Sequence, residues 1–374
     1  MAPPLEIPMK NATQHRPTMT DIAKMAGVSQ STVSLVLNNA TGAKFSDVTR
    51  QKVLQAAQTL GYQIAQRGSV PDAELQANPG DRNLIVYIAD EISTSPHPVV
   101  NIDGARDAAY AAGRMLAVYA TSGDSAIERQ ILASVRANPS VLGIIYATVY
   151  TRKVSLPRDQ LGDLPTVLLN CYADHSTYAS VVPAEVTGGH LATDYLLRSG
   201  HRRIGMINGE PWQDAARDRL KGYRMALTSA DLPYAAEMVR HGDWSSGAGF
   251  EQTLSLMREP RPPTAIFCAN DLMALGAIEA LKHLGLRIPD DVSVLGYDDQ
   301  EIARHTHPAL STVVLPNYEL GRWAVETLLR DAQSRAAGLP VRQGVVKLDG
   351  PLVERASVRV ITVAKTQEIN NINV

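Results

Sequence analysis

The sequence predicts a multidomain chain: an N-terminal all-α helix-turn-helix unit, followed by an α/β body of two lobes that are each built on a parallel sheet. Apolar residues recur at helical spacing between residues 19 and 60, which indicates short amphipathic helices. From Asn83 onward, continuous apolar runs alternate with helical stretches, a pattern typical of parallel strands covered on both faces. Two such series follow one another, so two similar lobes are expected. A chain of 374 residues is long enough for two or three cores.

The predicted turn between the first two helices is Gly27-Val28-Ser29. Glycine accepts the positive φ of a tight corner, and serine caps the helix that follows. The buried stripes of the two helices are expected to be Ile22, Met25 and Ala26, and then Val33, Val36 and Leu37. A third helix should follow, with Ser46 as its N-cap and a stripe of Val53, Leu54, Ala57 and Leu60. The spacing alone is also compatible with an ordinary helical hairpin.

The residue strings of this region are more specific than their spacing. Several of them closely resemble the DNA-reading headpiece of the lactose/galactose repressor (LacI/GalR) family: Asp21-Ile22-Ala23, Ala26-Gly27-Val28-Ser29, Thr32-Val33-Ser34 and Leu37-Asn38. The resemblance continues through Thr49-Arg50 and Leu60-Gly61-Tyr62. It implies a bacterial transcription regulator that binds double-stranded operator DNA.

The same resemblance implies which side chains contact DNA: Thr20, Ser29, Gln30, Ser31, Thr32, Ser34, Leu35, Asn38 and Arg50. Gln30 and Ser31 match the first two base-reading positions of the recognition helix. Leu35 stands where many members carry an arginine that reads guanine, and leucine favours a thymine methyl group instead. Thr32, Ser34, Asn38 and Arg50 would bind phosphates, which carry no sequence information directly. The distribution of charge is consistent with DNA binding. Residues 1–67 hold seven basic and three acidic side chains, a net charge of +4, in a chain whose net charge is −2.

The polar stretch 63–82 is interrupted by Gly68, Pro71, Pro79 and Gly80. The family usually has a hinge helix here, with a leucine wedged into the minor groove. We expect a flexible linker instead, in which Val70 or Leu75 is the candidate wedge. The expected domains are a disordered lead (1–17), a headpiece (18–62), the linker (63–82), an effector-binding and dimerisation domain (83–362) and a tail (363–374). Within the effector domain, we expect lobe 1 at 83–182 and 316–343, and lobe 2 at 183–315 and 344–362.

Polar side chains gather where the predicted strands of the body end: Asp90-Glu91, Thr121, Asn170, Asn270-Asp271 and Asp298-Asp299. Ligands of open parallel sheets bind outside the carboxyl ends of the strands. Some of these residues must instead begin loops or cap helices, and we interpret Asp271 as the N-cap of the next helix. Convergence of the others from both lobes predicts a ligand site.

Across residues 84–362 the body resembles the family's effector domain, which is itself similar to periplasmic sugar-binding proteins. The matching strings are SGHRRIG (199–205), ARDRLKGY (216–223), HGDW (241–244), CANDLMALGA (268–277), VLGYDD (294–299) and HPALSTV (307–313). The effector contacts predicted from the resemblance and the strand ends are Thr121, Asn170, Arg217, Arg219, Trp244, Asn270 and Asp298. Arg219 would grip ligand oxygens, Asn270 and Asp298 would bind vicinal hydroxyls, and Trp244 would stack on a ring. Two alternatives remain: Trp244 as a core aromatic, and Arg219 in a helix-surface pair with Asp214 or Asp218.

Other classes of protein find little support. His305 and His307 are two residues apart with no cysteine nearby, so we expect no metal, and no cofactor either. The chain has no nucleophile elbow, Walker loop or zinc motif, so we expect no enzyme. No apolar run approaches the ~20 residues of a membrane span. Residues 1–17 do not form a signal peptide, and Cys171 and Cys268 are expected to be buried thiols of a cytoplasmic protein.

Together, these observations predict a sequence-specific transcriptional regulator, most simply a repressor, controlled by a small sugar-like effector bound between the lobes. We expect a homodimer or a dimer of dimers, because two-fold operators match two-fold proteins. One alternative is a regulator of the same type that responds to a purine or nucleoside. A stand-alone solute-binding protein is another, although it would not need a headpiece.

Overall fold

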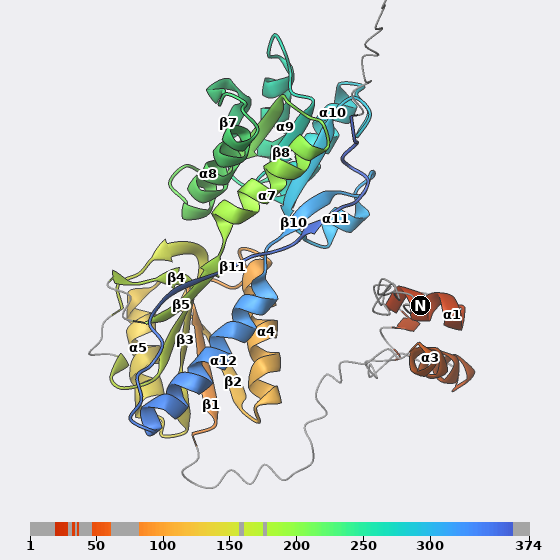
Figure 1. Cartoon of the computed structure of the whole chain (residues 1–374). Helices are drawn as coiled ribbons and strands as arrows, with labels where there is room; N and C mark the ends of the chain where they lie inside the picture. The colour runs from red at the N-terminus through yellow and green to blue at the C-terminus, as the bar shows by residue number, and fades with distance from the viewer. Residues whose placement is uncertain are drawn as a thin grey trace, which may run out of the picture. The chain divides into compact units, whose positions relative to one another are not determined.

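The computed structural model describes residues 19–28, 32–33, 36, 47–60, 82–156, 161–174 and 178–361. The chain divides into two compact units, Met1–Leu75 and Gln76–Val374, which are treated separately below (Figure 1). The expected lead, linker and tail fall almost entirely outside the described residues.

The first unit contains the helices α1 (Met19–Ala26) and α3 (Asp47–Thr59). Its core includes Ile22, Val33, Val36, Val53 and Ala57, all buried, with Val28 and Leu60 packed against them. Gly27 has the predicted positive φ, at +67°. The small core therefore forms from the stripes that the spacing predicted.

Two residues of those stripes are exposed, and their prediction was wrong. Met25 is 51% exposed and Leu54 is 43% exposed. The buried face of α1 is rotated toward Ala23, and that of α3 toward Ala56. Both alanines neighbour the expected stripe, and a core this small has room for only one narrow face of each helix.

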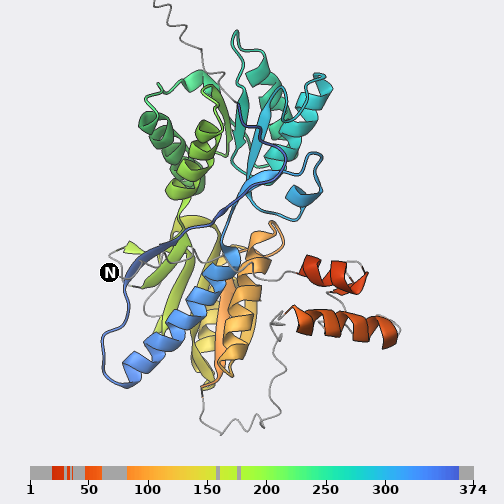
Figure 2. The same ribbon diagram turned by 45° about the vertical axis from the view of Figure 1, so that its right-hand side comes forward.

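Lobe 1 of the second unit is built on a six-stranded sheet in the order β11-β5-β4-β3-β1-β2, in which every pairing is parallel. Its strands are β1 (Leu84–Ala89), β2 (Met115–Ala120), β3 (Val141–Lys153), β4 (Thr166–Tyr172), β5 (Ala179–Pro183) and β11 (Gly344–Leu348). Its helices are α4 (His97–Ala111), α5 (Ser125–Ala137) and α12 (Asn317–Ala336). Helices α4 and α12 lie side by side on one face of the sheet (Figure 2). They approach closely, since a Cβ on Gly104 would lie 2.0 Å from the carbonyl oxygen of Tyr318.

Lobe 2 repeats this plan with the order β12-β10-β9-β8-β6-β7. Its strands are β6 (Ile204–Asn208), β7 (Val239–His241), β8 (Ala265–Cys268), β9 (Ser293–Asp298), β10 (Ser311–Val314) and β12 (Leu352–Val353). Its helices are α7 (Glu185–Arg198), α8 (Asp214–Ser229), α9 (Ser246–Met257), α10 (Asp271–His283) and the short α11 (Ile302–His305), with a 3-10 turn at Ala236–Met238. The prediction of two α/β lobes with parallel sheets is confirmed, apart from the short antiparallel edge strand β12.

The chain crosses between the lobes three times within residues 178–361: after β5, after β10 and after β11. Strand β11 pairs with β5 in the sheet of lobe 1, so the last crossing follows Leu348, five residues later than expected. The apolar pattern of an edge strand does not indicate which of two similar sheets it joins, and this explains the difference.

Each sheet has one apolar cluster on either face, formed with its covering helices. Cys171 and Cys268 are buried free thiols, as predicted. Over the described part of the chain, no helix combines the length and apolar character needed to cross a membrane.

Candidate effector site

A cavity of about 360 Å³ lies between the lobes, within the usual range for ligand pockets. Five of the seven predicted effector residues line it: Asn170, Arg219, Trp244, Asn270 and Asp298. They come from β4, α8, the loop before α9, the start of α10 and the end of β9. The carboxyl ends of strands from both lobes therefore meet at one cavity, as the parallel topology requires.

Thr121 and Arg217 do not line this cavity. Thr121 follows the edge strand β2, where its backbone N–H donates to Ala89 O at 2.9 Å. Arg217 is 56% exposed at its side chain, pairs with Asp214 and donates to Trp212 O at 2.7 Å. Because residues two apart on a helix face in nearly opposite directions, Arg217 and Arg219 cannot both point into the cavity.

Arg219 is held by a partner that sequence reasoning missed. Its Nε donates to Glu185 Oε2 at 2.7 Å and its Nη2 donates to Glu185 Oε1 at 2.9 Å. Nη1 donates to Ala269 O, and the guanidinium lies 3.8 Å from the ring centre of Tyr297. Burial lowers the pKa of Arg219, but Glu185, Tyr297 and Asp298 together raise it by more, so the guanidinium stays charged. The expected alternative, a surface pair with Asp214 or Asp218, is not formed.

Asp298 lines the cavity and has one carboxylate oxygen without a hydrogen-bond partner among the described residues. Its Oδ2 accepts from Gln300 Nε2 at 3.0 Å, whereas its buried Oδ1 has no hydrogen-bond partner among the described residues. Arg219 Nη2 is 3.8 Å from Oδ1, too far for a hydrogen bond. An ionised oxygen buried without a donor is costly, so this atom is suited to a ligand.

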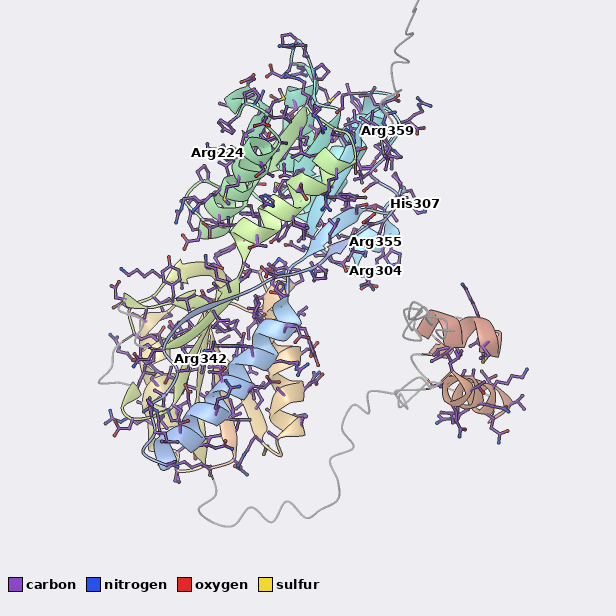
Figure 3. All side chains as sticks on the ribbon, viewed as in Figure 1. Arg224, Arg304, His307, Arg342, Arg355 and Arg359 are labelled. Atoms are coloured by element: carbon purple, nitrogen blue, oxygen red, sulfur yellow. The ribbon has the colours of Figure 1, made fainter. Side chains whose placement is uncertain are left out.

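The backbone around Asp298 is strained. Asp298 and the next residue, Asp299, have φ values of +108° and +53°, which L-residues rarely adopt. The Asp299 carboxylate is held by Arg355 at 2.5 Å and by Arg304 at 3.5 Å, and these two arginines are labelled together in Figure 3. Strain of this kind persists only where the surroundings impose it, and it is frequent at binding sites.

Asn270 and Trp244 form one unit in the lobe 2 wall of the cavity. Asn270 Oδ1 accepts from the backbone N–H of Met273 at 2.8 Å and so caps α10, and its Nδ2 donates to Trp244 O at 2.9 Å. Trp244 has a φ of +69°, and a Cβ on Gly209 would lie only 1.9 Å from its ring. The indole N–H is buried without a partner among the described residues. Trp244 is half-buried and packs against the lobe 2 core, so its ring serves both the core and the cavity.

The interpretation of Asp271 as a helix cap was wrong, since the neighbouring Asn270 caps α10. Asp271 is fully buried, and it accepts from Thr312 Oγ1 and from the backbone N–H of Gln300, both at 2.7 Å. Burial, reinforced by Asp298, raises the pKa of Asp271 to about 8. Its carboxyl group ties the start of α10 to the loop that follows Asp298.

Asn170 lines the cavity but uses its polar atoms within the protein. Its Nδ2 donates to the carbonyl oxygens of Thr148 and Val149 at 2.9 and 3.0 Å, and its Oδ1 accepts from Thr151 Oγ1 at 2.5 Å. These bonds shape the wall at the irregular part of β3. They leave little capacity for a ligand.

Sequence reasoning missed several polar side chains that line the cavity, among them His97, Glu185 and Gln300. Glu185 follows the unrecognised strand β5, so the rule of polar strand ends could have found it. His97 is the first residue of α4, and no strand-end or motif argument points to it. Gln300 lies two residues beyond the predicted Asp298.

Of the predicted DNA contacts, the structure describes the side chains of Thr32 and Arg50, both half-buried. Ser29, Gln30, Ser31, Ser34, Leu35 and Asn38 lie outside the described residues, as does the side chain of Thr20. Within the described ranges, no group of three or more His, Cys, Asp or Glu side chains is placed to hold a metal ion.

Comparison with known proteins gives matches to both units. Residues 18–64 match the family of bacterial regulatory proteins called lacI, and residues 193–358 match a periplasmic binding protein-like domain. The ribose operon repressor of Haemophilus influenzae is 32% identical over 314 residues, which cover 84% of this chain and 91% of the repressor. The transcriptional repressor PurR of Vibrio campbellii is 30% identical over 313 residues, 83% of this chain and 91% of its own.

Two solved structures share the architecture. The lac repressor dimer bound to operator and the anti-inducer ONPF is 29% identical and has a TM-score of 0.61, covering 92% of this chain and all of the repressor chain. A complex of the transcriptional regulator CelR with cellobiose is 29% identical, with a TM-score of 0.60 and coverage of 91% and 100%.

A helix-turn-helix unit joined to a two-lobed ligand-binding body defines a class of ligand-responsive regulators. The chain belongs to the LacI family of bacterial transcription regulators. It is a DNA-binding repressor with a periplasmic-binding-protein-like effector domain, and LacI-type repressors are not enzymes.

Proposed function

We propose that the effector is a sugar or sugar derivative, bound in the cavity between the lobes through Asp298, Trp244, Asn270 and Arg219. The observation that carries this proposal is a pair of unsatisfied buried atoms, the acceptor Asp298 Oδ1 and the donor Trp244 Nε1. Each hydroxyl of a sugar is both a donor and an acceptor, so a ring with several hydroxyls offers a donor for the first atom and an acceptor for the second.

The names of relatives agree with this class of effector, since they include a ribose operon repressor and a regulator bound to cellobiose. A purine or nucleoside is the alternative. Its ring nitrogens also offer a donor and an acceptor, and its flat ring would stack on Trp244. Thermal-shift screening of the full chain against neutral sugars, nucleosides and nucleobases separates the two classes. A sugar hit that disappears in Asp298→Asn supports the proposal, and a hit restricted to nucleobases overturns it.

DNA recognition is proposed to lie in residues 18–62, with Gln30, Ser31 and Leu35 facing bases. Thr32, Ser34, Asn38 and Arg50 would bind phosphates, and Thr20 and Ser29 complete the contact set. Residues 63–82 would act as a linker without the family's standard hinge helix. Binding should weaken steeply with salt, because each neutralised phosphate releases counterions.

A homodimer is proposed on the exposed edge of lobe 1. Met115 and Tyr119 on the edge strand β2 are 53% and 43% exposed, and Tyr110 on α4 is 50% exposed. Apolar side chains on an unpaired sheet edge are a liability unless a partner covers them. The lac repressor, which shares the fold, is a dimer on its operator. Analytical ultracentrifugation tests this assignment. The parent chain should sediment as a dimer, and the double variant Met115→Glu/Tyr119→Lys should sediment as a monomer.

A further inference from the structure

One pair of side chains from opposite lobes approaches closely at the wall of the cavity. His97 is the first residue of α4 in lobe 1, and its Nε2 lies 3.5 Å from Oδ2 of Asp298, at the end of β9 in lobe 2. The His97 side chain is 24% exposed and that of Asp298 is 3% exposed. Both residues line the cavity. Closing or opening of the lobes must therefore change the distance between them.

The surroundings of His97 fix which ring nitrogen carries the proton. Its Nδ1 lies 3.0 Å from Nδ2 of Asn317, the first residue of α12. An amide nitrogen only donates, so Nδ1 accepts and the neutral ring carries its proton on Nε2. Asn317 follows the second crossing between the lobes, so the segment that joins the lobes also orients the ring. The Nε2–H group then points toward Asp298.

The His97–Asp298 pair is incomplete. A separation of 3.5 Å exceeds the 2.7–3.2 Å of an N–H···O hydrogen bond. Within the described part of the chain, the Asp298 carboxylate accepts only from Gln300, through Oδ2, and its Oδ1 is unpaired. A donor thus faces an acceptor with no bond between them. A ligand hydroxyl satisfies both sides, since it accepts from His97 Nε2–H and donates to Asp298.

The charges around the cavity favour a ligand without negative charge. The negative charge of Glu185 and the positive charge of Arg219 compensate each other. Glu210 and Asp243 also line the cavity, and they add to the negative charge of Asp298. A carboxylate or phosphate on the ligand would meet three acids, and among the lining residues the one Lys or Arg side chain is Arg219, whose charge Glu185 already offsets; like charges at close range are strongly unfavourable.

We propose that His97 is a specificity-determining residue of the effector site, which together with Asp298 selects an uncharged polyhydroxyl ligand and binds one of its hydroxyls from both lobes. This inference rests on the proposed sugar-effector function. It adds a contact from lobe 1, whereas Asp298, Trp244, Asn270 and Arg219 all belong to lobe 2. One ligand hydroxyl held from both sides would tie the lobes together, so occupancy would set their separation.

Calorimetric titration of the full chain tests the proposal. The neutral probes are D-ribose, D-galactose and cellobiose, and the acidic probes are D-ribose 5-phosphate and D-galacturonate. His97→Phe keeps an aromatic ring without a donor and should weaken the best-bound neutral probe about tenfold, the effect of one lost hydrogen bond. His97→Gln keeps an N–H near the position of Nε2 and should stay within about threefold of the parent. The control is His305→Phe, because His305 is 67% exposed and does not line the cavity; it should bind as the parent does.

The double variant His97→Phe/Asp298→Asn should lose less than the product of the two single losses, because both residues serve the same hydroxyl. The acidic probes should bind at least tenfold more weakly than their neutral counterparts. If His97→Phe keeps full affinity while Asp298→Asn loses it, the role of His97 is overturned and the effector site stands. If Asp298→Asn also keeps full affinity, or no neutral sugar binds the parent, the proposed effector site fails as well.

Discussion

Arg219 on α8 and Glu185 on α7 form a two-armed ion pair whose side chains are only 4% and 5% exposed. The pair lies against the ring of Tyr297 and closes one wall of the effector cavity. This contact depends on the close packing of α7 and α8. Their backbones approach so closely that a Cβ on Gly189 in α7 would lie 2.3 Å from the carbonyl oxygen of Arg219 in α8. Arg219 therefore supports the fold as well as lining the cavity.

Removing one member of this pair should destabilise the chain strongly. Arg219→Ala leaves Glu185 buried without a counter-charge, which costs about 3–5 kcal/mol. Urea unfolding of Arg219→Ala should show this loss, whereas Arg217→Ala, at an exposed position, should stay within about 0.5 kcal/mol of the parent. Equal stability of the two variants would contradict the structural role. It also follows that an effector defect in Arg219→Ala cannot be assigned to a lost ligand contact alone.

Asp271 should make stability depend on pH. An aspartate ordinarily titrates near 3.8, whereas burial and the nearby Asp298 raise the pKa of Asp271 to about 8. Between these values the folded chain retains a proton that the unfolded chain has lost. The resulting stabilisation is fully present below about pH 4 and disappears as the pH rises through 8.

Asp271→Asn imitates the protonated acid and should remove this dependence. Its amide oxygen can accept from Gln300, and its NH₂ can donate to Thr312 Oγ1. As the pH is raised from 5 to 7 and then to 9, the urea midpoint of the parent should fall relative to the midpoint of the variant. A constant difference between the two proteins across this range would show that Asp271 does not titrate there.

Asp298→Asn should separate effector binding from DNA binding. The substitution removes the charge of the unpaired acceptor, and effector affinity should drop at least tenfold, since hydrogen bonds to charged groups contribute about 1.5–3 kcal/mol. Ligand-free operator affinity should stay near that of the parent, because every residue that lines the cavity lies between Thr94 and Asn317, outside the proposed DNA-binding residues 18–62. Calorimetry and gel shifts on the same preparation measure the two quantities. A parallel loss of both would indicate a folding defect instead.

The recognition helix supplies a fourth prediction. Gln30→Ala should cost about 1–3 kcal/mol on the operator and little on random DNA, as expected for one base-edge contact. Leu35→Arg should change the preferred sequence toward guanine rather than tighten binding to every sequence. Selection from randomised duplexes compares the parent with the Leu35 variant. Recovery of the same site from both would mean that Leu35 does not face the bases.

The order of the domains, strands and helices could be predicted from the sequence because it depends on local patterns of apolar and polar residues. Continuous apolar runs predicted the parallel strands, and polar residues at their ends identified Asn270 and Asp298 in the cavity. The helical stripes predicted most of the headpiece core, and failed at Met25 and Leu54 because neighbouring alanines occupy the narrow buried faces.

What the sequence did not reveal depends on distant contacts. Glu185 and Arg219 are 34 residues apart, and only the packing of α7 on α8 shows that they meet. Thr121 sits at a strand end like the others, but its strand β2 is at the edge of the sheet, away from the cavity. Strand β11 joins lobe 1 because β5 offers it an edge, a choice that its own residues do not encode.

Electrophoretic mobility shift on an operator selected from random duplexes tests the central claim most directly, namely an effector-controlled repressor with DNA binding confined to the headpiece. The full chain should shift this operator, and the neutral sugar found by calorimetry should change the affinity severalfold in the parent but not in Asp298→Asn. A chain that starts at Asn83 should bind the same sugar and give no shift. A specific shift by that shortened chain, or an operator affinity of the full chain that no bound ligand alters, would contradict the account.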